Sequence, residues 1–190
     1  MIKKILLATA LLLFLNGCGS GPTSDDETTI NTPTINNIEK KDYNLWEYMV
    51  PTNDRVNSFS LYNNDETKPS ETYTTSYKVY ENLVEESSSY APDEKTIYEK
   101  KDNEIVVSFQ KDNSIMGFFT LELQANIDDM VTKKASDCKL EKHYPLYNDK
   151  FSDVIEIVCG NQHGFYQKNV GEISQIAQDE TSKKVRILSN

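Results

Sequence analysis

The sequence has few of the residues from which common catalytic sites are built. Its 190 residues include only seven glycines and two histidines. It contains no Gly-x-Ser-x-Gly elbow, no glycine-rich phosphate loop and no His-Glu-x-x-His motif. Pairs of carboxylates need no motif, but each of the 30 acidic residues taken alone fits a solvated surface. We therefore expect a protein that is not an enzyme.

Basic residues are outnumbered by acidic ones, 20 against 30, and long apolar runs are scarce. The net charge of −10 argues against binding to nucleic acid or to anionic headgroups. The longest apolar run, residues 5–15, is interrupted only by Thr9. It is shorter than the roughly 20 residues of a membrane-spanning helix. With Lys3 and Lys4 before it, the run instead matches the apolar region of an export signal.

The end of that run, Leu15-Asn16-Gly17-Cys18, resembles the lipobox of bacterial lipoproteins. Leucine three positions before the cysteine and a small residue immediately before it belong to the family pattern, whereas Asn16 departs from it. The resemblance covers residues 1–18. It implies a signal peptide over residues 1–17 and cleavage between Gly17 and Cys18. It also implies a diacylglycerol and an acyl chain on Cys18, and we expect no other cofactor.

Residues 18–42 then form a tether rich in Ser, Thr, Asn, Asp, Gly and Pro, which we expect to be disordered. A flexible coil of this length holds a domain on the order of 25 to 30 Å from the membrane on average. In lipoproteins, aspartate after the lipidated cysteine favours inner-membrane retention, and Gly19 lacks this signal. The resemblance therefore implies the outer membrane, with the domain facing the periplasm or the cell surface.

The remaining residues, 43–190, are expected to form one β-rich domain. Short runs of Tyr, Thr, Val, Ile and Phe are separated by Asn, Asp, Lys and Ser, which is the pattern of strands and turns. The predicted strands are residues 45–50, 56–62, 73–80, 87–90, 96–101, 104–110, 115–123, 137–143, 154–159, 165–170, 172–177 and 184–188. Their spacing predicts a mainly β fold, an antiparallel meander that forms a curved sheet, a sandwich or an open barrel. At most one short helix is expected, within residues 124–135.

Assignment of Cys18 to lipid leaves Cys138 and Cys159 as a pair in a compartment where disulfides form. A two-residue turn at Asn148-Asp149 makes the two cysteines direct partners at a position without hydrogen bonds, where side chains approach most closely. Pro145 has no N–H to donate and predicts an irregularity near the turn. The pattern therefore predicts a cross-strand disulfide.

A metal site is the alternative for the same region. Cys138, His143, Cys159 and His163 form a set of two cysteines and two histidines, which zinc or copper(I) accepts. Their intervals lack the close Cys-x2-Cys spacing of a strong zinc signal, so the disulfide is preferred and the histidines are then surface or rim residues. Candidate calcium ligands, without the glycine and final glutamate of a known loop, are either Asn126, Asp128 and Asp129 or Asn148 and Asp149.

The function expected from these features is binding or scaffolding at the outer membrane. The alternatives are a hydrophobic-ligand or lipoprotein carrier with a half-open β barrel, and a metal-handling protein. Expected partners are the membrane, through the lipid, and an envelope protein, peptide or saccharide. The aromatic residues that would line such a surface, or else fill the core, are Tyr43, Trp46, Tyr48, Tyr73, Tyr77, Tyr80, Tyr90 and Tyr98. Residues 159–173 are similar to the final hairpin of small β-rich periplasmic lipoproteins.

The substitution Cys18→Ser should leave an uncleaved or soluble precursor that carries no lipid, because serine has no thiol to form the thioether. Incorporation of labelled palmitate into the wild-type and variant chains measures this. Continued labelling of the variant would contradict lipidation at Cys18.

Overall fold

The computed structural model describes residues 41–64, 66–133 and 137–189. Gly17, Cys18 and the tether up to residue 40 lie outside these residues, so the expected cleavage site and lipid anchor remain predictions. Lys41–Asn190 form one compact unit. In the described part of this unit, no helix has the length and apolar character needed to cross a membrane.

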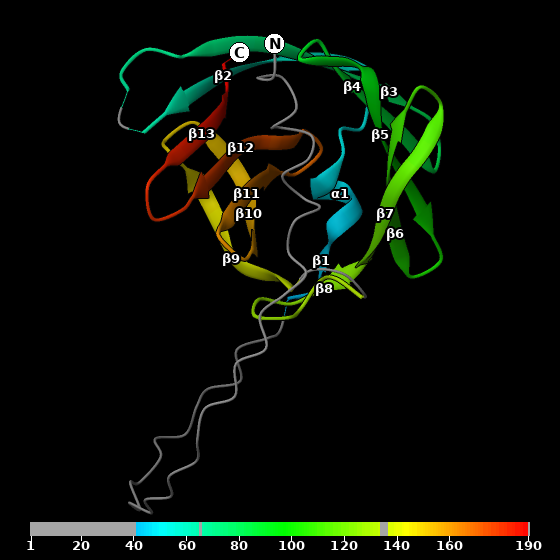
Figure 1. Cartoon of the computed structure of the whole chain (residues 1–190). Helices are drawn as coiled ribbons and strands as arrows, with labels where there is room; N and C mark the ends of the chain where they lie inside the picture. The colour runs from blue at the N-terminus through cyan, green and yellow to red at the C-terminus, as the bar shows by residue number, and fades with distance from the viewer. Residues whose placement is uncertain (1–40, 65, 134–136, 190) are drawn as a thin grey trace, which may run out of the picture. The chain divides into compact units, whose positions relative to one another are not determined.

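Two meanders of antiparallel strands make up one sheet (Figure 1). The first contains β2 (Arg55–Asn63), β3 (Glu71–Val79), β4 (Leu83–Ser88), β5 (Ala91–Lys101), β6 (Glu104–Lys111) and β7 (Ser114–Glu122). The second contains β9 (Cys138–Tyr147), β10 (Phe151–Cys159), β11 (Gln162–Gln167), β12 (Gly171–Gln178) and β13 (Lys183–Leu188). The last strand, β13, pairs with the first, β2, so the eleven strands form one open sheet with edges at β7 and β9. The predicted mainly β, antiparallel fold is confirmed.

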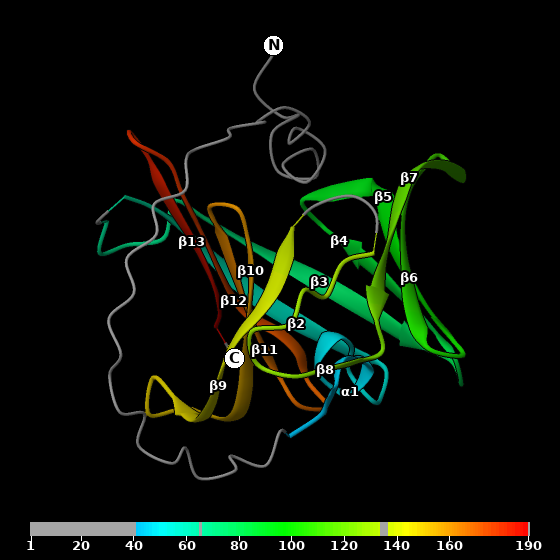
Figure 2. The same cartoon turned by 90° about the horizontal axis from the view of Figure 1, so that it is seen from below.

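The sheet is curved around a short helix, α1 (Leu45–Met49), which lies on its concave side (Figures 1 and 2). Along β3, Tyr73, Thr75 and Tyr77 are buried while the residues between them are more exposed. This alternation has the period of two expected for a strand with one face in the core. Tyr77 belongs to the same apolar cluster as Leu45 of α1, so the buried face of β3 is the concave face.

The prediction of a strand over residues 45–50 is wrong, because this run forms α1. Leu45, Tyr48 and Met49 are buried, and their spacing is that of one helical face. The side chain of Asn44 caps the helix, since its Oδ1 accepts a hydrogen bond from the backbone N–H of Trp46 at 3.2 Å. A small second sheet holds the start of this segment, where β1 (Tyr43–Asn44) pairs with β8 (Gln124–Ala125).

The described residues hold one short helix, α1, as the expectation of at most one allowed, but it does not lie within residues 124–135, which are described as far as residue 133. The chain here forms β8 and then an irregular segment that bridges the two edges of the sheet. The backbone N–H of Val131 donates to the carbonyl of Cys138 in β9, and the N–H of Glu122 in β7 donates to the carbonyl of Val131, both at 2.8 Å. Asp128 has a φ of 72°, which a continuous right-handed helix does not allow.

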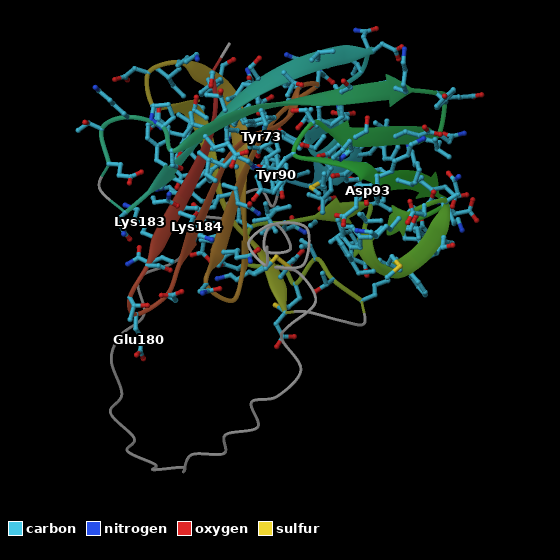
Figure 3. All side chains as sticks on the ribbon, turned by 45° about the horizontal axis from the view of Figure 1, so that its top comes forward. Tyr73, Tyr90, Asp93, Glu180, Lys183 and Lys184 are labelled. Atoms are coloured by element: carbon cyan, nitrogen blue, oxygen red, sulfur yellow. A yellow bond between two sulfur atoms is a disulfide. The ribbon has the colours of Figure 1, made fainter. Side chains whose placement is uncertain are left out.

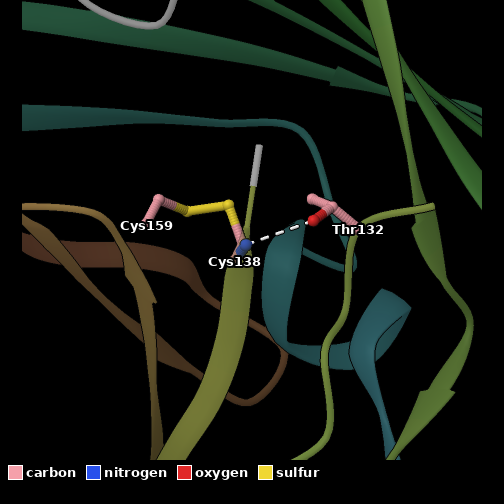
Figure 4. Close-up of a disulfide and its surroundings, with 3 residues drawn as sticks. All are labelled: Thr132, Cys138 and Cys159. Carbon is pink, nitrogen blue, oxygen red and sulfur yellow. Dashed lines mark hydrogen bonds between the residues drawn. A yellow bond between two sulfur atoms is a disulfide. The ribbon is translucent and has the colours of Figure 1, made fainter. Parts of the chain in front are cut away.

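The disulfide between Cys138 and Cys159 is confirmed, with the two Cα atoms 4.2 Å apart (Figure 4). Its register results from two irregularities that cancel. The turn has three residues rather than two, because Tyr147 pairs with Phe151, and a bulge near Glu156 restores the predicted partners. The expected irregularity at Pro145 is present too, since the β9–β10 ladder skips that position.

The two edges of the sheet differ in composition. The edge strand β9 carries three charged residues and a proline: Lys139, Glu141, Lys142 and Pro145. The edge strand β7 has no charged residue before Glu122, and Ile115, Met116 and Phe118 are 66%, 61% and 69% exposed. Charge and proline are the usual means of protecting a sheet edge, so only the β9 edge is protected in this way.

Loss of the disulfide should lower the free energy of unfolding by about 3 kcal/mol, because it closes a loop of 21 residues in the unfolded chain. Urea unfolding of the full chain with and without reductant measures the change. The double variant Cys138→Ala/Cys159→Ala is the control, since reductant should not affect it. Equal unfolding midpoints for oxidised and reduced wild-type protein would contradict this prediction.

Candidate functional site

A pocket of about 350 Å³ opens beside α1, and we call it the α1 pocket. Its volume lies within the range of about 300 to 1,000 Å³ found for small-molecule sites. Three separate parts of the chain line it: α1 with the residues after it, the β3–β4 turn and the β11–β12 turn. The lining residues are Trp46, Glu47, Val50, Pro51, Thr52, Val79, Tyr80, Glu81 and Asn169.

The helix wall of the pocket is fixed to the β11–β12 turn by hydrogen bonds at both ends. The backbone N–H of Asn169 donates to the carbonyl of Glu47 at 2.6 Å, and the N–H of Thr52 donates to the carbonyl of Asn169 at 3.3 Å. Gly171 follows with a φ of 87°, and a Cβ there would lie 3.4 Å from the ring of Pro51. A glycine at this position therefore allows the turn to approach the chain after α1.

The opposite wall, at the end of β3, is held by Asp54. Its carboxylate accepts hydrogen bonds from Lys78 Nζ and from the backbone N–H of Val79, each at 2.8 Å. These two hydrogen bonds, first that of Lys78, lower the pKa of Asp54. The turn then closes through the N–H of Tyr80, which donates to the carbonyl of Leu83 at 2.8 Å. Both walls are thus built from hydrogen-bonded backbone.

The pocket combines aromatic rings with negative charge. Trp46 is the only tryptophan in the chain, and Tyr80 is 55% exposed. Of the residues that line the pocket, Glu47 and Glu81 are acidic and none is basic. Glu47 is paired with Lys168, whose Nζ lies 2.9 Å from its carboxylate, whereas no described residue forms an ion pair with Glu81.

A second group of polar residues lies deeper, on the concave face of the sheet. We call Tyr73, Glu86, Tyr98, Glu172 and Arg186 the concave cluster. The hydroxyl of Tyr98 donates to Glu86 at 2.8 Å, and Arg186 donates to the hydroxyl of Tyr73 at 3.2 Å and to Glu172. Figure 3 shows Tyr73 next to Tyr90, with ring centroids 5.6 Å apart. Strand pairing places Tyr73 and Glu86 on the same face as Tyr77, and hydrogen bonds hold Tyr98, Arg186 and Glu172 beside them.

Burial shifts the ionisation of the concave cluster. Removal from water raises the pKa of Glu86, and the nearby Glu172 adds to the increase, while Arg186 and the hydrogen bond from Tyr98 oppose it. Burial also opposes the charge on Arg186, but Glu172 and Tyr73 outweigh it and hold the pKa of Arg186 well above its usual value. Arg186 Nε has no hydrogen-bond partner among the described residues. The cluster is thus a partly satisfied group of charges in a low-dielectric setting.

The four residues of the alternative metal set are not brought together. The two sulfur atoms are bonded to each other, and the two histidines lie on opposite faces of the sheet, since His143 pairs with Ile155 and His163 with Val158. No group of three or more metal-binding side chains occurs in the described part of the chain.

Each histidine instead contacts a carboxylate. His143 Nε2 lies 2.8 Å from Asp153 Oδ1, which also accepts a hydrogen bond from the hydroxyl of Tyr48 in α1. Partial burial works to raise the pKa of Asp153, but the hydrogen bonds from His143 and Tyr48 lower it overall. His163 Nδ1 lies 2.7 Å from Glu156. The sequence predicted surface or rim histidines and did not predict that each would contact a carboxylate.

The remaining candidates from the sequence have structural roles in the described chain. Asp129 accepts hydrogen bonds from both the backbone and the side chain of Asn126, and Asp128 pairs with Lys139. Asn148 and Asp149 occupy the β9–β10 turn with φ values of 52° and 55°. Most of the aromatic residues named from the sequence are core or cluster residues, and Trp46 and Tyr80 are the two that line the α1 pocket.

Comparison of the sequence with models of protein families, with curated proteins and with solved structures found no match.

The substitution Glu86→Gln should stabilise the domain more at pH 8 than at pH 4.5. The raised pKa of Glu86 means that its folded state favours the protonated carboxyl, so its contribution to stability falls as the pH rises through that pKa. Each unit of elevation corresponds to about 1.4 kcal/mol, or about 3 to 5 °C in unfolding temperature for a domain of this size.

Thermal unfolding of both proteins across that pH range measures the difference. Glu71→Gln removes the same charge from an exposed position of β3 and controls for the change in net charge. A stability gain for Glu86→Gln that does not grow with pH would contradict the prediction.

Proposed function

We propose that this chain is a lipid-anchored binding module of a bacterial envelope, and that the α1 pocket is its binding site. The observation that carries the proposal is the pocket itself, in which the single tryptophan and a half-exposed tyrosine lie between walls fixed by backbone hydrogen bonds. Sites that bind small ligands are usually formed before the ligand arrives and combine apolar surface with a few placed polar groups. The ligands proposed are a saccharide or a peptide of the envelope.

The proposed location is the outer membrane, with the domain facing the periplasm or the cell surface. Support comes from the lipobox-like sequence that ends at Cys18 and from Gly19 after it. The disulfide is consistent with this location, because such bonds persist mainly in exported proteins. A tether of about two dozen residues would let the pocket reach ligands some distance from the membrane.

A carrier of a hydrophobic ligand or lipoprotein is the second candidate, and the curved open sheet favours it. The concave face is where such a carrier would hold an acyl chain. The charged side chains of Glu86, Glu172 and Arg186 lie on that face, and burying apolar chains against them would be costly. Binding at the α1 pocket is therefore the preferred function.

A thermal-shift screen of envelope saccharides and short peptides on the full-length protein tests the preferred function. A ligand present at 100 times its Kd adds about 2.7 kcal/mol to the folded state, which is about 5 to 10 °C for this size. Thr52→Phe should abolish the shift, because Thr52 is exposed and lines the pocket. Thr72→Phe, an exposed site on β3 outside the pocket, is the matched control.

A ligand that stabilises the Thr52→Phe variant as much as the wild type would place binding elsewhere and contradict the proposal. Native mass spectrometry of protein purified from a detergent extract addresses the carrier. A mass without bound lipid would count against it, and a bound lipid retained by Thr52→Phe would favour the carrier over the α1 pocket.

A further inference from the structure

We infer that the α1 pocket recognises an organic cation, that is, an alkylammonium group such as a quaternary amine or the side chain of a lysine. The inference rests on the proposed function and names the chemical class of its ligand. It follows from three observations at the pocket: the aromatic rings of Trp46 and Tyr80, the unpaired carboxylate of Glu81, and the lack of a basic residue among those that line it.

Aromatic rings attract cations through the negative potential of their faces, and tryptophan does so most strongly. The two rings of the α1 pocket come from different elements, Trp46 from α1 and Tyr80 from the β3–β4 turn, and both are held on hydrogen-bonded backbone. Both rings line the α1 pocket, so a cation bound there would lie beside them. Elsewhere in the domain the same attraction is already used, since Lys142 Nζ lies 4.8 Å from the ring of Tyr144.

The charges around the pocket favour a positively charged ligand. Glu81 is exposed and has no ionic partner among the described residues. Glu47 is neutralised by Lys168 at 2.9 Å, so one net negative charge remains at the pocket. The two lysines beside the lining residues are both paired, Lys168 with Glu47 and Lys78 with Asp54. An anionic ligand would meet Glu81 without a basic residue among those that line the pocket to offset it.

The field of the whole chain acts in the same direction. The net charge is −10, or −12 once Lys3 and Lys4 are removed with the signal. Such a surface attracts cations and repels anions, and the attraction decreases with ionic strength. An organic cation gains from both the field and the aromatic rings, whereas the described residues hold no group of three metal-binding side chains for a small metal ion.

The experiment uses Trp46, whose emission reports on this pocket alone because the chain has no other tryptophan. Full-length protein in a non-ionic detergent is titrated with choline, with butylammonium and with 3,3-dimethylbutanol, which has the shape of choline but no charge. We expect the cations to change the emission with saturation and the neutral alcohol to have no effect. Raising the salt from 50 to 500 mM should weaken the binding several-fold.

Two variants test the residues. Glu81→Gln should weaken cation binding about three-fold to five-fold, as expected for loss of a partly exposed charge. Tyr80→Leu should weaken it by a similar factor. Glu71→Gln, at the other end of β3 and also exposed, removes the same charge from the domain and should leave the affinity unchanged.

The possible outcomes distinguish failure of the cation assignment from failure of the proposed function. Equal binding of choline and its neutral analogue, or equal affinity in Glu81→Gln and the wild type, would overturn the cation assignment and leave the α1 pocket as a binding site. No change in Trp46 emission with any compound would also overturn it. The Thr52→Phe screen would then show separately whether the pocket binds a different ligand.

Discussion

The pairing of β13 with β2 is the constraint on which the rest of the structure depends. It joins two meanders that would otherwise be separate sheets, each with an additional open edge. Because the joined sheet curves, its concave face has room for α1 and for the concave cluster. The α1 pocket exists for the same reason: the β3–β4 turn belongs to the first meander and the β11–β12 turn to the second, and α1 fills the space between them.

The concave cluster and the α1 pocket show two uses of polar residues in one domain. In the cluster, Arg186 and Glu172 neutralise each other in buried surroundings, an arrangement that contributes little net stability but penalises any packing that separates them. At the pocket, Glu81 is left unpaired at the surface, where hydration makes a single charge inexpensive. The charge available to a ligand is therefore that of Glu81, which the described residues of the domain do not use in an ion pair.

Much of the fold could be predicted from local patterns, because alternation and turn residues act over a few positions. The Cys138–Cys159 disulfide was also predictable, although the three-residue turn and the bulge near Glu156 that set its register left no simple signal. The helix α1 was predicted as a strand because a six-residue run that is apolar apart from Glu47 fits a strand equally well. Asn44 followed three residues later by Glu47 is a capping signal that identifies it. The α1 pocket joins segments over a hundred residues apart, which no local pattern reports.

The unequal edges of the sheet bear on how the protein behaves when it is concentrated. The β9 edge, with its charges, its proline and its bulge, is a poor template for another strand. The β7 edge presents Ile115, Met116 and Phe118 on an uncharged stretch with high β propensity. At high protein concentration, chains would therefore associate first through the first six residues of β7. Elsewhere on the domain, the negative charge keeps neighbouring chains apart.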